Sequence, residues 1–208
     1  MPEKMIENIH WLGHDGFYAE GSKIVYFDPY EISGGPKADL ILITHEHFDH
    51  CSPDDVAKVI KDDTVIVTEA DSAQKLSGNV QVLKPGESTE VAGVKVTALP
   101  SYNVDKDFHP RANNWLGFVV ELDGVTIYHA GDADFIPEMK DLNVDIALIP
   151  VSGTYVMTAD QGIEAARAIK PRIAVPMHYG AIVGSEDDAK KFAEALKDEI
   201  TVVIKEKE

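Results

Sequence analysis

Residues 44–51 of the chain, Thr-His-Glu-His-Phe-Asp-His-Cys, concentrate groups that bind protons and metal ions. Three of the eight histidines of the sequence lie in this stretch, together with two carboxylates. Side chains alternate along an extended segment, so His45 and His47 point to the same side and can face one ion. Asp49 and His50 can bind a second, adjacent ion if the chain turns so that His50 also points inward. The start of a helix just beyond this stretch would supply that turn.

Imidazole nitrogens and carboxylate oxygens are both ligands of zinc, and catalytic zinc sites leave one position open for water. Four candidate ligands lie within the six residues from His45 to His50, and they cannot all bind one ion and leave that position open. The stretch therefore predicts two divalent ions. Zinc is the first expectation, and manganese or iron also fits, because His and carboxylate ligands do not fix the identity of the metal. The alternative is a polar loop whose histidines titrate in solvent.

The length and composition predict one globular domain over residues 1–208. Hydrophobic residues make up 44% of the 208-residue chain and charged residues 26%, which is ordinary for a domain of this size. No apolar run approaches the roughly 20 residues that a bilayer span requires. The first sixteen residues carry acids and lack a cationic start followed by an apolar stretch, so we expect them to belong to the fold and the protein to be cytoplasmic.

The net charge disfavours nucleic acid as a partner. The formal charge is −17, and a field of that sign repels a polyanion at long range. We therefore expect a small-molecule substrate, no membrane partner, and a homo-oligomer only as an open possibility. Cys51 is the single cysteine, which excludes an intrachain disulfide and a zinc site built from cysteines. We expect its thiol to be buried and inert, although a nucleophilic role is the alternative.

Apolar runs and turn residues alternate along the whole chain, which is typical of a layered α/β fold. The runs that predict strands are Lys23–Phe27, Leu40–Ile43, Thr64–Val67, Val94–Leu99, Trp115–Leu122, Val125–Tyr128, Val144–Ile149, Arg172–Val175 and Thr201–Ile204. The segments that predict helices are Pro53–Ile60 after Ser52, Ala159–Ile169 after Thr158, and Glu186–Leu196 after Ser185. Thr158 and Gln161 have the spacing of a capping box, and Asp123-Gly124 is typical of a hairpin turn.

Several of these strands deliver polar groups at their ends. Nearly continuous apolar runs indicate strands that are buried on both faces. Leu40–Ile43 ends in Thr44-His45, Val125–Tyr128 leads to Asp132, and Arg172–Pro176 leads to Met177-His178. A weak internal echo, in which two strands joined by a loop occur in each half of the chain, suggests two similar β-rich halves. The polar groups would then converge at one edge of a sheet sandwich.

These motifs resemble those of a known family. The segment from His45 to His50 has the H-x-H-x-D-H form of the metallo-β-lactamase superfamily, and Ala130-Gly131-Asp132 and Met177-His178 follow it in order. Trp11-Leu12-Gly13-His14 and Phe27-Asp28-Pro29 precede it. The chain is similar in particular to the subgroup that contains UlaG-like lactonases and related metal-dependent hydrolases. The similarity covers most of the chain and is poorly specific to substrate.

The resemblance implies a four-layer αββα sandwich with two metal ions at one edge. It assigns His45, His47 and a third histidine to the first ion, Asp49, His50 and His178 to the second, and Asp132 to a bridge between them. His109 is the expected third histidine, because it precedes the strand at Trp115–Leu122 as the third motif of the family does. The surrounding Phe108-His109-Pro110-Arg111 departs from the common G-H-T form.

Other residues receive supporting roles or structural alternatives. The resemblance implies that Asp28 supports the metal loop by hydrogen bonding. It also implies a catalytic or substrate-contacting role for His14; the alternative is that His14 makes only a structural hydrogen bond. Asp132 could instead cap a helix over Phe135–Lys140, and His178 could simply be hydrogen-bonded at a strand end. Two histidines without a motif, His10 and His129, are expected to be structural. Four further residues could contact substrate or serve only as turn residues or polar loop residues: Asn103, Asn113, Asn114 and Tyr155.

The predicted function is hydrolysis of a small ester, lactone, phosphodiester or related bond by a metal-bridging hydroxide, with Asp49 or Asp132 orienting it. An amidohydrolase barrel is a weak rival, because such barrels need about 250 residues or more. A di-iron redox protein on the same fold is a second rival, although such proteins tend to have Glu where this chain has His47. The third is a noncatalytic sensor that binds metal or a small ligand.

Overall fold

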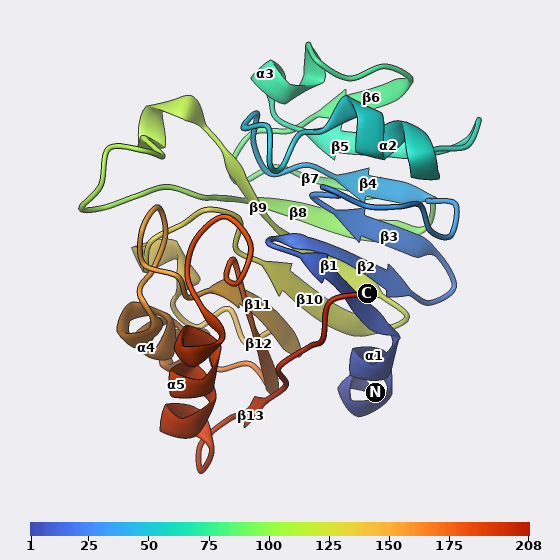
Figure 1. Cartoon of the computed structure of the whole chain (residues 1–208). Helices are drawn as coiled ribbons and strands as arrows, with labels where there is room; N and C mark the ends of the chain where they lie inside the picture. Colours follow the sequence, from blue (N-terminus) through green and yellow to red (C-terminus); the bar gives the residue numbers. More distant parts are fainter.

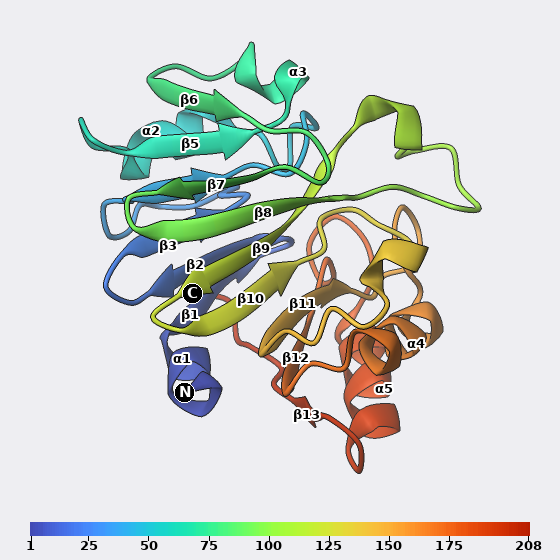
Figure 2. The same ribbon diagram turned by 180° about the vertical axis from the view of Figure 1, so that it is seen from behind.

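Two β-sheets pack face to face in the computed structural model, which describes residues 1–208 (Figure 1). The first sheet contains, in spatial order, β1 (Ile9–Gly13), β2 (Gly16–Glu20), β3 (Ile24–Phe27), β4 (Leu40–Leu42), β5 (Val65–Thr68) and β6 (Asn79–Val82). The second contains β13 (Thr201–Val202), β12 (Ile173–Met177), β11 (Ile146–Pro150), β10 (Val125–His129), β9 (Leu116–Leu122), β8 (Val94–Pro100) and β7 (Ser88–Val91). Seen from behind, β8, β9 and β10 lie in front of the first sheet (Figure 2).

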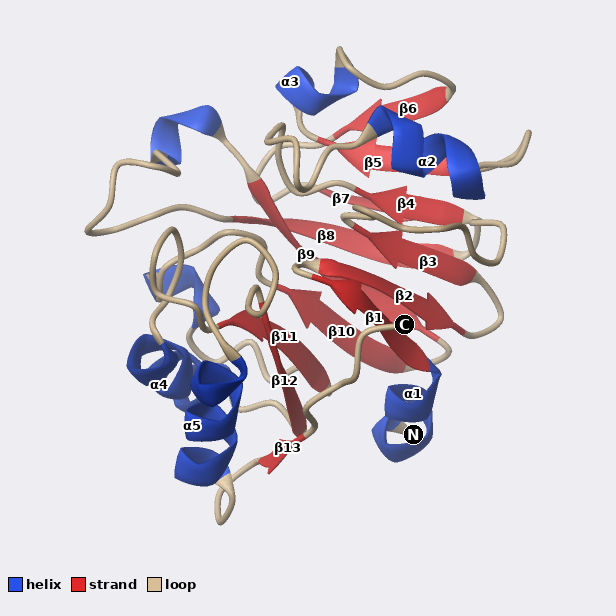
Figure 3. Cartoon of the chain, in the orientation of Figure 1, coloured by secondary structure: helices blue, strands red, loops and turns tan.

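Helices cover the outer side of each sheet. The α-helices are α1 (Pro2–Met5), α2 (Pro53–Val59), α3 (Ala70–Ala73), α4 (Ala159–Ile169) and α5 (Glu186–Leu196), and short 3₁₀ helices span η1 (Ile6–Asn8), η2 (Arg111–Asn113) and η3 (Pro137–Met139). α2 and α3 lie with the first sheet, whereas α4 packs on β11 and α5 on β12 and β13 (Figure 3). The layers are therefore αββα, as predicted. None of the helices is both long and apolar enough to cross a membrane.

The three predicted helices, α2, α4 and α5, start where the sequence predicts, whereas the short helices α1 and α3 were not predicted. The Oγ1 atom of Thr158 accepts from the backbone N–H of Gln161 at 3.2 Å, and Oε1 of Gln161 accepts from the N–H of Thr158 at 2.9 Å. This confirms the capping box, which satisfies two backbone donors that a helix start leaves free. Ser52 caps α2 in a related way, by accepting from the N–H of Asp55 at 3.3 Å.

The alternation of β4 explains its continuous apolar sequence. Leu40 and Leu42 are buried in the large core between the sheets, whereas Ile41 and Ile43 belong to a second core. That second core lies against α2, whose Val56 also contributes to it. Because both faces of β4 are covered, polar residues are excluded from the strand and appear only after it.

The two sheets repeat one arrangement of strands. In the first sheet β1, β2 and β3 are antiparallel neighbours, and β3 through β6 are parallel. In the second sheet β8, β9 and β10 are antiparallel neighbours, and β10 through β13 are parallel. The internal echo of the sequence therefore corresponds to equivalent strands. The carboxyl ends of the parallel strands in each sheet share one edge, and this edge carries the site.

Some sequence expectations need correction. β1, β2, β6 and β7 are additional strands, and several predicted boundaries shift by one or two residues. The segment Phe135–Lys140 forms only the 3₁₀ turn η3, which begins after Ile136 and has no side-chain cap. The alternative role of Asp132 as the cap of a helix there is therefore wrong, because the turn begins too far along the chain.

Candidate metal centre

Four loops at this edge bring together every residue for which metal binding is predicted. The loop after β4 carries His45, His47, Asp49 and His50, the β8–β9 loop carries His109, and the segments after β10 and β12 carry Asp132 and His178. Groups of these side chains place ligand atoms within 4.8 Å of one another.

The first group consists of His45, His47 and His109. Nε2 of His45 lies 3.0 Å from Nδ1 of His47, and the three residues place one ligand nitrogen each within 4.8 Å of the others. Burial lowers the pKa of His45 well below its ordinary value and also lowers that of His47. These two imidazoles are therefore neutral at neutral pH, which is the form that binds a metal ion.

The second group surrounds Asp132. Oδ1 of Asp132 lies 3.4 Å from Nε2 of His50 and 3.3 Å from Nε2 of His178. Oδ2 of Asp49 lies 3.8 Å from Nε2 of His50. The other oxygen of Asp132, Oδ2, lies 3.1 Å from Nε2 of His109. One carboxylate oxygen thus faces each group, which is the placement that a bridging ligand requires.

Hydrogen bonds to Nδ1, on the side of each ring that faces away from the centre, determine that Nε2 faces the centre. Nδ1 of His50 donates to Oδ2 of Asp28 at 2.8 Å, and Nδ1 of His178 donates to Oγ of Ser152 at 2.8 Å. Nδ1 of His109 has Oδ1 of Asn103 at 3.1 Å as an acceptor. In each ring the lone pair of Nε2 is thereby left for the centre.

Four buried atoms at the centre have no hydrogen-bond partner. They are Nε2 of His50, Nε2 of His109, Oδ1 of Asp132 and Nε2 of His178. Buried polar atoms are normally satisfied, so a cluster of such atoms indicates a missing partner. A divalent cation accepts imidazole nitrogen and carboxylate oxygen together. The residues present therefore fit a metal ion by an observation that is independent of the sequence motif.

The charges of the second group depend on one another. Burial alone would raise the pKa of Asp132, but the charges of His178 and His50 hold it well below its ordinary value. Burial would likewise lower the pKa of His50 and His178, but the negative charge of Asp132 raises both. An added proton on either imidazole would balance the negative charge of Asp132, and a bound metal cation would take the place of that proton.

His14 lies at the second group. Its Nε2 donates to Oδ2 of Asp49 at 3.1 Å, and its ring centroid lies 4.0 Å from that of His178. Burial lowers the pKa of His14, so the neutral ring orients Asp49 at neutral pH. The backbone of His14 has φ 51°, a left-handed conformation that is uncommon outside glycine and often occurs at functional sites.

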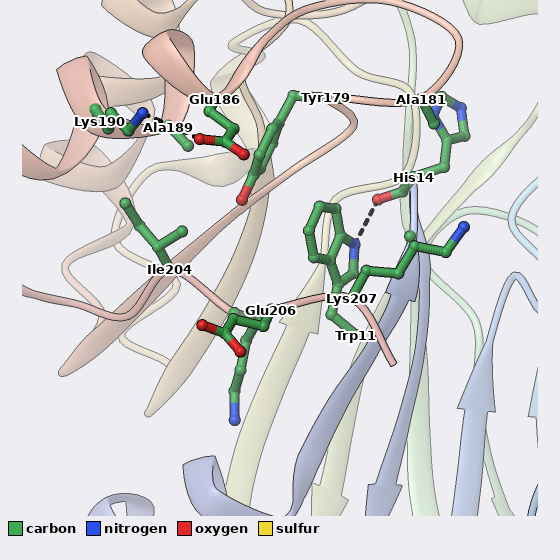
Figure 4. Close-up of a pocket in the computed structure, with 13 residues that line it drawn as sticks. Trp11, His14, Tyr179, Ala181, Glu186, Ala189, Lys190, Ile204, Glu206 and Lys207 are labelled. Carbon is green, nitrogen blue, oxygen red and sulfur yellow. Dashed lines mark hydrogen bonds and ion pairs between the residues drawn. The ribbon is translucent and has the colours of Figure 1, made fainter.

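A cavity of about 520 Å³ lies beside the centre without containing it. Trp11, Tyr179 and Lys207 are among its 13 lining residues (Figure 4). The carbonyl oxygen of His14 accepts a hydrogen bond from Nε1 of Trp11 at 2.9 Å on the cavity side, whereas the imidazole points away from it (Figure 4). His14 is the one predicted site residue among the lining residues.

Gly131 allows Asp132 to reach the centre. Its φ is +61°, and a Cβ at this position would lie 2.9 Å from the carbonyl oxygen of Leu116 and 3.1 Å from Oγ of Ser101. The first distance is too short for a real Cβ and involves backbone, which cannot move cheaply. A glycine before Asp132 is therefore required by both the turn and the close approach of β9.

The loop residues proposed as substrate contacts divide into two kinds. Nδ2 of Asn103 donates to the carbonyl oxygen of Tyr155 at 2.9 Å, while Oδ1 of Asn103 accepts from the backbone N–H of His109 at 3.0 Å. Asn103 therefore holds the segment that carries His109. Asn113 and Asn114 are exposed, and Nδ2 of Asn114 donates locally to the carbonyl of Ala112 at 3.2 Å, as ordinary turn residues do.

Three further residues lie outside the centre. Nδ1 of His10 pairs with Oε1 of Glu208 at 2.5 Å, and Nε2 of His129 donates to the carbonyl oxygen of Asp15 at 2.9 Å. Cys51 is buried, and burial raises the pKa of its thiol to about 11. The thiol is therefore protonated at neutral pH, which disfavours a nucleophilic role.

Sequence reasoning missed some residues of the site. Thr44 donates from Oγ1 to Asp28 at 2.6 Å and lies 3.0 Å from Nδ1 of His45. The ring of Trp115 lies 4.8 Å from those of His45 and His47. Oγ of Ser152 lies 2.8 Å from Nδ1 of His178. Thr44 and Trp115 each adjoin a predicted strand end, and this position was the only signal available for them.

Comparison with known proteins agrees with this geometry. The family described as Beta-lactamase superfamily domain matches residues 8–178. A UPF0173 metal-dependent hydrolase of Pyrococcus abyssi is 34% identical, with 94% of this chain and 95% of the relative covered, and one of Thermococcus onnurineus is 35% identical with the same coverage. A solved structure of a candidate metal-dependent hydrolase from Parabacteroides distasonis is 37% identical over 96% of this chain and 93% of that chain, with a TM-score of 0.85. The chain therefore belongs to the metallo-β-lactamase superfamily and, within it, to the family of metal-dependent hydrolases that these relatives represent.

Proposed function

We propose that the protein hydrolyses a small ester, lactone or related acyl bond at a centre of two divalent ions. The observation that carries this proposal is the set of unpartnered buried atoms around Asp132, on His50, His109 and His178. Names of relatives that contain the words metal-dependent hydrolase support the reaction class. When bound, divalent ions polarise a carbonyl or phosphoryl oxygen and lower the pKa of water, which provides a nucleophile without an activated Ser or Cys.

The ligand sets differ between the two proposed positions. His45, His47 and His109 would hold the first ion through three imidazole nitrogens, and this set favours zinc. Asp49, His50 and His178 would hold the second, with Asp132 between the two. Manganese or iron also suits the second set, because it contains carboxylate oxygens.

The chain's own carboxylates would position the reacting groups. Asp132 has one oxygen toward each group, so it keeps the two positions adjacent. Asp49 accepts a hydrogen bond from His14, and this contact fixes the orientation of a carboxylate that is only partly buried. We assign Asp49 and Asp132 to orienting the attacking water. His14 acts through Asp49, and its Nδ1 has no partner in the protein.

Three exposed apolar side chains that lie near candidate ligands in the sequence, called the apolar rim, support a substrate with an apolar group. We define this rim as Phe48, Phe108 and Ile182, whose exposed fractions are 68%, 52% and 42%. Each is either next to a candidate ligand in the chain or in the loop that follows one. The ring of Phe48 packs edge-on against Tyr30 with centroids 5.9 Å apart, and that of Phe108 packs against Tyr155 at 4.8 Å. An aromatic or alkyl acyl group would cover this exposed apolar surface.

A substrate panel tests the proposal. Metal-loaded protein would be assayed against aromatic esters, lactones, thioesters, amides and phosphodiesters, and His47→Ala would be the matched variant. We expect turnover of the acyl substrates that falls at least about 100-fold in His47→Ala, because a ligand of the nucleophile-generating ion is lost. Absence of turnover across the panel would contradict hydrolysis and favour a binding or sensor role.

A further inference from the structure

Asp15 is a buried carboxylate that is not among the ligands of the proposed centre. Its side chain is 0% exposed, and neither of its carboxylate oxygens has a hydrogen-bond partner. Glu69, a buried acid outside the centre, is satisfied by comparison: both of its carboxylate oxygens accept from the backbone N–H groups of Asp71 and Ser72. A wholly buried carboxyl group without a donor either holds a proton or pairs with a cation.

The surroundings of Asp15 indicate what this partner is. Ligand atoms of Asp15, Asp132 and His178 lie within 4.8 Å of one another, and so do those of Asp15, Asp28 and His50. The neighbouring imidazoles do not donate to Asp15, because Nδ1 of His50 donates to Asp28 and Nδ1 of His178 to Ser152.

The atoms without hydrogen-bond partners around Asp15 include both carboxylate oxygens and imidazole nitrogens. Oδ1 of Asp132, Nε2 of His178 and Nε2 of His50 lack partners, as both oxygens of Asp15 do. Two carboxylates and two imidazole nitrogens cannot satisfy one another by hydrogen bonds unless protons are added. A divalent cation can accept ligand atoms of both kinds.

We propose that Asp15 is a ligand of the second ion, in addition to Asp49, His50, Asp132 and His178. This inference rests on the proposed metal centre. The second position then offers three carboxylates and two imidazoles, whereas the first offers three imidazoles and a share of Asp132. Oxygen-rich sets with more than four ligands suit Mn²⁺ better than zinc. The centre thus pairs a nitrogen-rich position with an oxygen-rich position that takes an Mn²⁺-type ion.

Titration with Mn²⁺ alone tests this assignment. Metal-free wild type, Asp15→Asn and Asp15→Ser would be titrated while free Mn²⁺ is followed by electron paramagnetic resonance. We expect one of the two binding equivalents to weaken by at least about tenfold in both variants, as loss of an ionic ligand requires, while the other changes little. Glu69→Gln, which alters a buried and fully hydrogen-bonded acid, is the matched control and should leave both equivalents unchanged.

The possible results separate this inference from the proposed function. Folded Asp15→Asn that binds both equivalents as wild type does would overturn the role of Asp15 and leave the centre intact. Wild type that binds no Mn²⁺ would overturn the oxygen-rich second position and with it the role of Asp15, whereas the proposed function would still be decided by the turnover of zinc-loaded protein. If neither variant folds, anomalous diffraction from wild-type crystals soaked in Mn²⁺ decides: an Asp15 oxygen within about 2.5 Å of the ion supports the inference, and a clearly longer distance overturns it.

Discussion

Asp28 accepts a hydrogen bond from Nδ1 of His50 at 2.8 Å, and this contact turns Nε2 of the same ring toward Asp132, 3.4 Å away. Asp28 also accepts from the backbone N–H of Thr44 at 2.8 Å and from its Oγ1 at 2.6 Å. Thr44 in turn lies 3.0 Å from Nδ1 of His45. One buried carboxylate thus orients histidines of both ligand groups.

Asp28→Asn should weaken metal binding without removing a ligand. The amide cannot accept from the ring and from Thr44 as the carboxylate does, so we expect a loss of about 10- to 100-fold in metal affinity. Calorimetric titration of metal-free protein measures the change. Asp39→Asn alters a carboxylate that pairs with Lys61 at 2.7 Å, away from the centre, and serves as the control. An affinity within twofold of wild type in Asp28→Asn would refute this role.

His109→Ala should remove one of the two ions. His109 supplies the third nitrogen of the first group, and a position with only two imidazoles binds zinc weakly. We expect the metal content measured by plasma mass spectrometry to fall from about two ions to about one per chain. His10→Ala changes a histidine that contacts Glu208, so it should keep both ions. Equal metal content in the two variants would show that His109 is not a ligand.

Metal binding should release protons. The negative charge of Asp132 raises the pKa of His50 and His178 against the effect of burial, so in the metal-free protein both rings keep the added proton to a higher pH than an ordinary histidine does. A ligand must lose its proton before it binds. Affinity should therefore rise with pH until these groups have deprotonated and fall as pH drops. Calorimetry at one pH in buffers of different ionisation enthalpy measures the release, and a value of zero would contradict the account.

Phe48→Ala should impair apolar substrates selectively. Burial of part of this exposed ring by a substrate contributes on the order of 1 kcal/mol, which corresponds to about a fivefold loss in kcat/KM for an aromatic ester. A short acetate ester should change little. Val82→Ala, an equally simple truncation of a side chain that is 44% exposed on β6, is the control. Equal losses for both esters would argue against contact between the rim and the substrate.

The sequence predicted the parts of the site that follow from local pattern. The continuous apolar run of β4 required burial on both faces, so His45 had to appear after it, and the spacing to His50 required a turn. His109 was placed by its order in the chain rather than by its neighbours, and the structure brings it into the first group.

The contacts that join distant segments could not be predicted in the same way. Ser152 reaches His178 because β11 and β12 are neighbours, and neither residue has a local signal for this pairing. Asp15 lies close to Asp28, Asp132 and His178, which come from three other segments. Its local sequence therefore could not show that its carboxylate oxygens lack hydrogen-bond partners. β6 and β7 were missed because partly exposed edge strands carry only a weak alternation of apolar residues.

The central claim is that the buried histidines and carboxylates form a centre of two ions on which hydrolysis depends. The most direct measurement is the metal content and hydrolytic rate of one preparation before metal removal, after thorough chelation, and after addition of Zn²⁺ or Mn²⁺. We expect about two ions per chain, loss of turnover together with the metal, and recovery of both on addition. Full turnover by protein from which the metal has been removed would contradict the account.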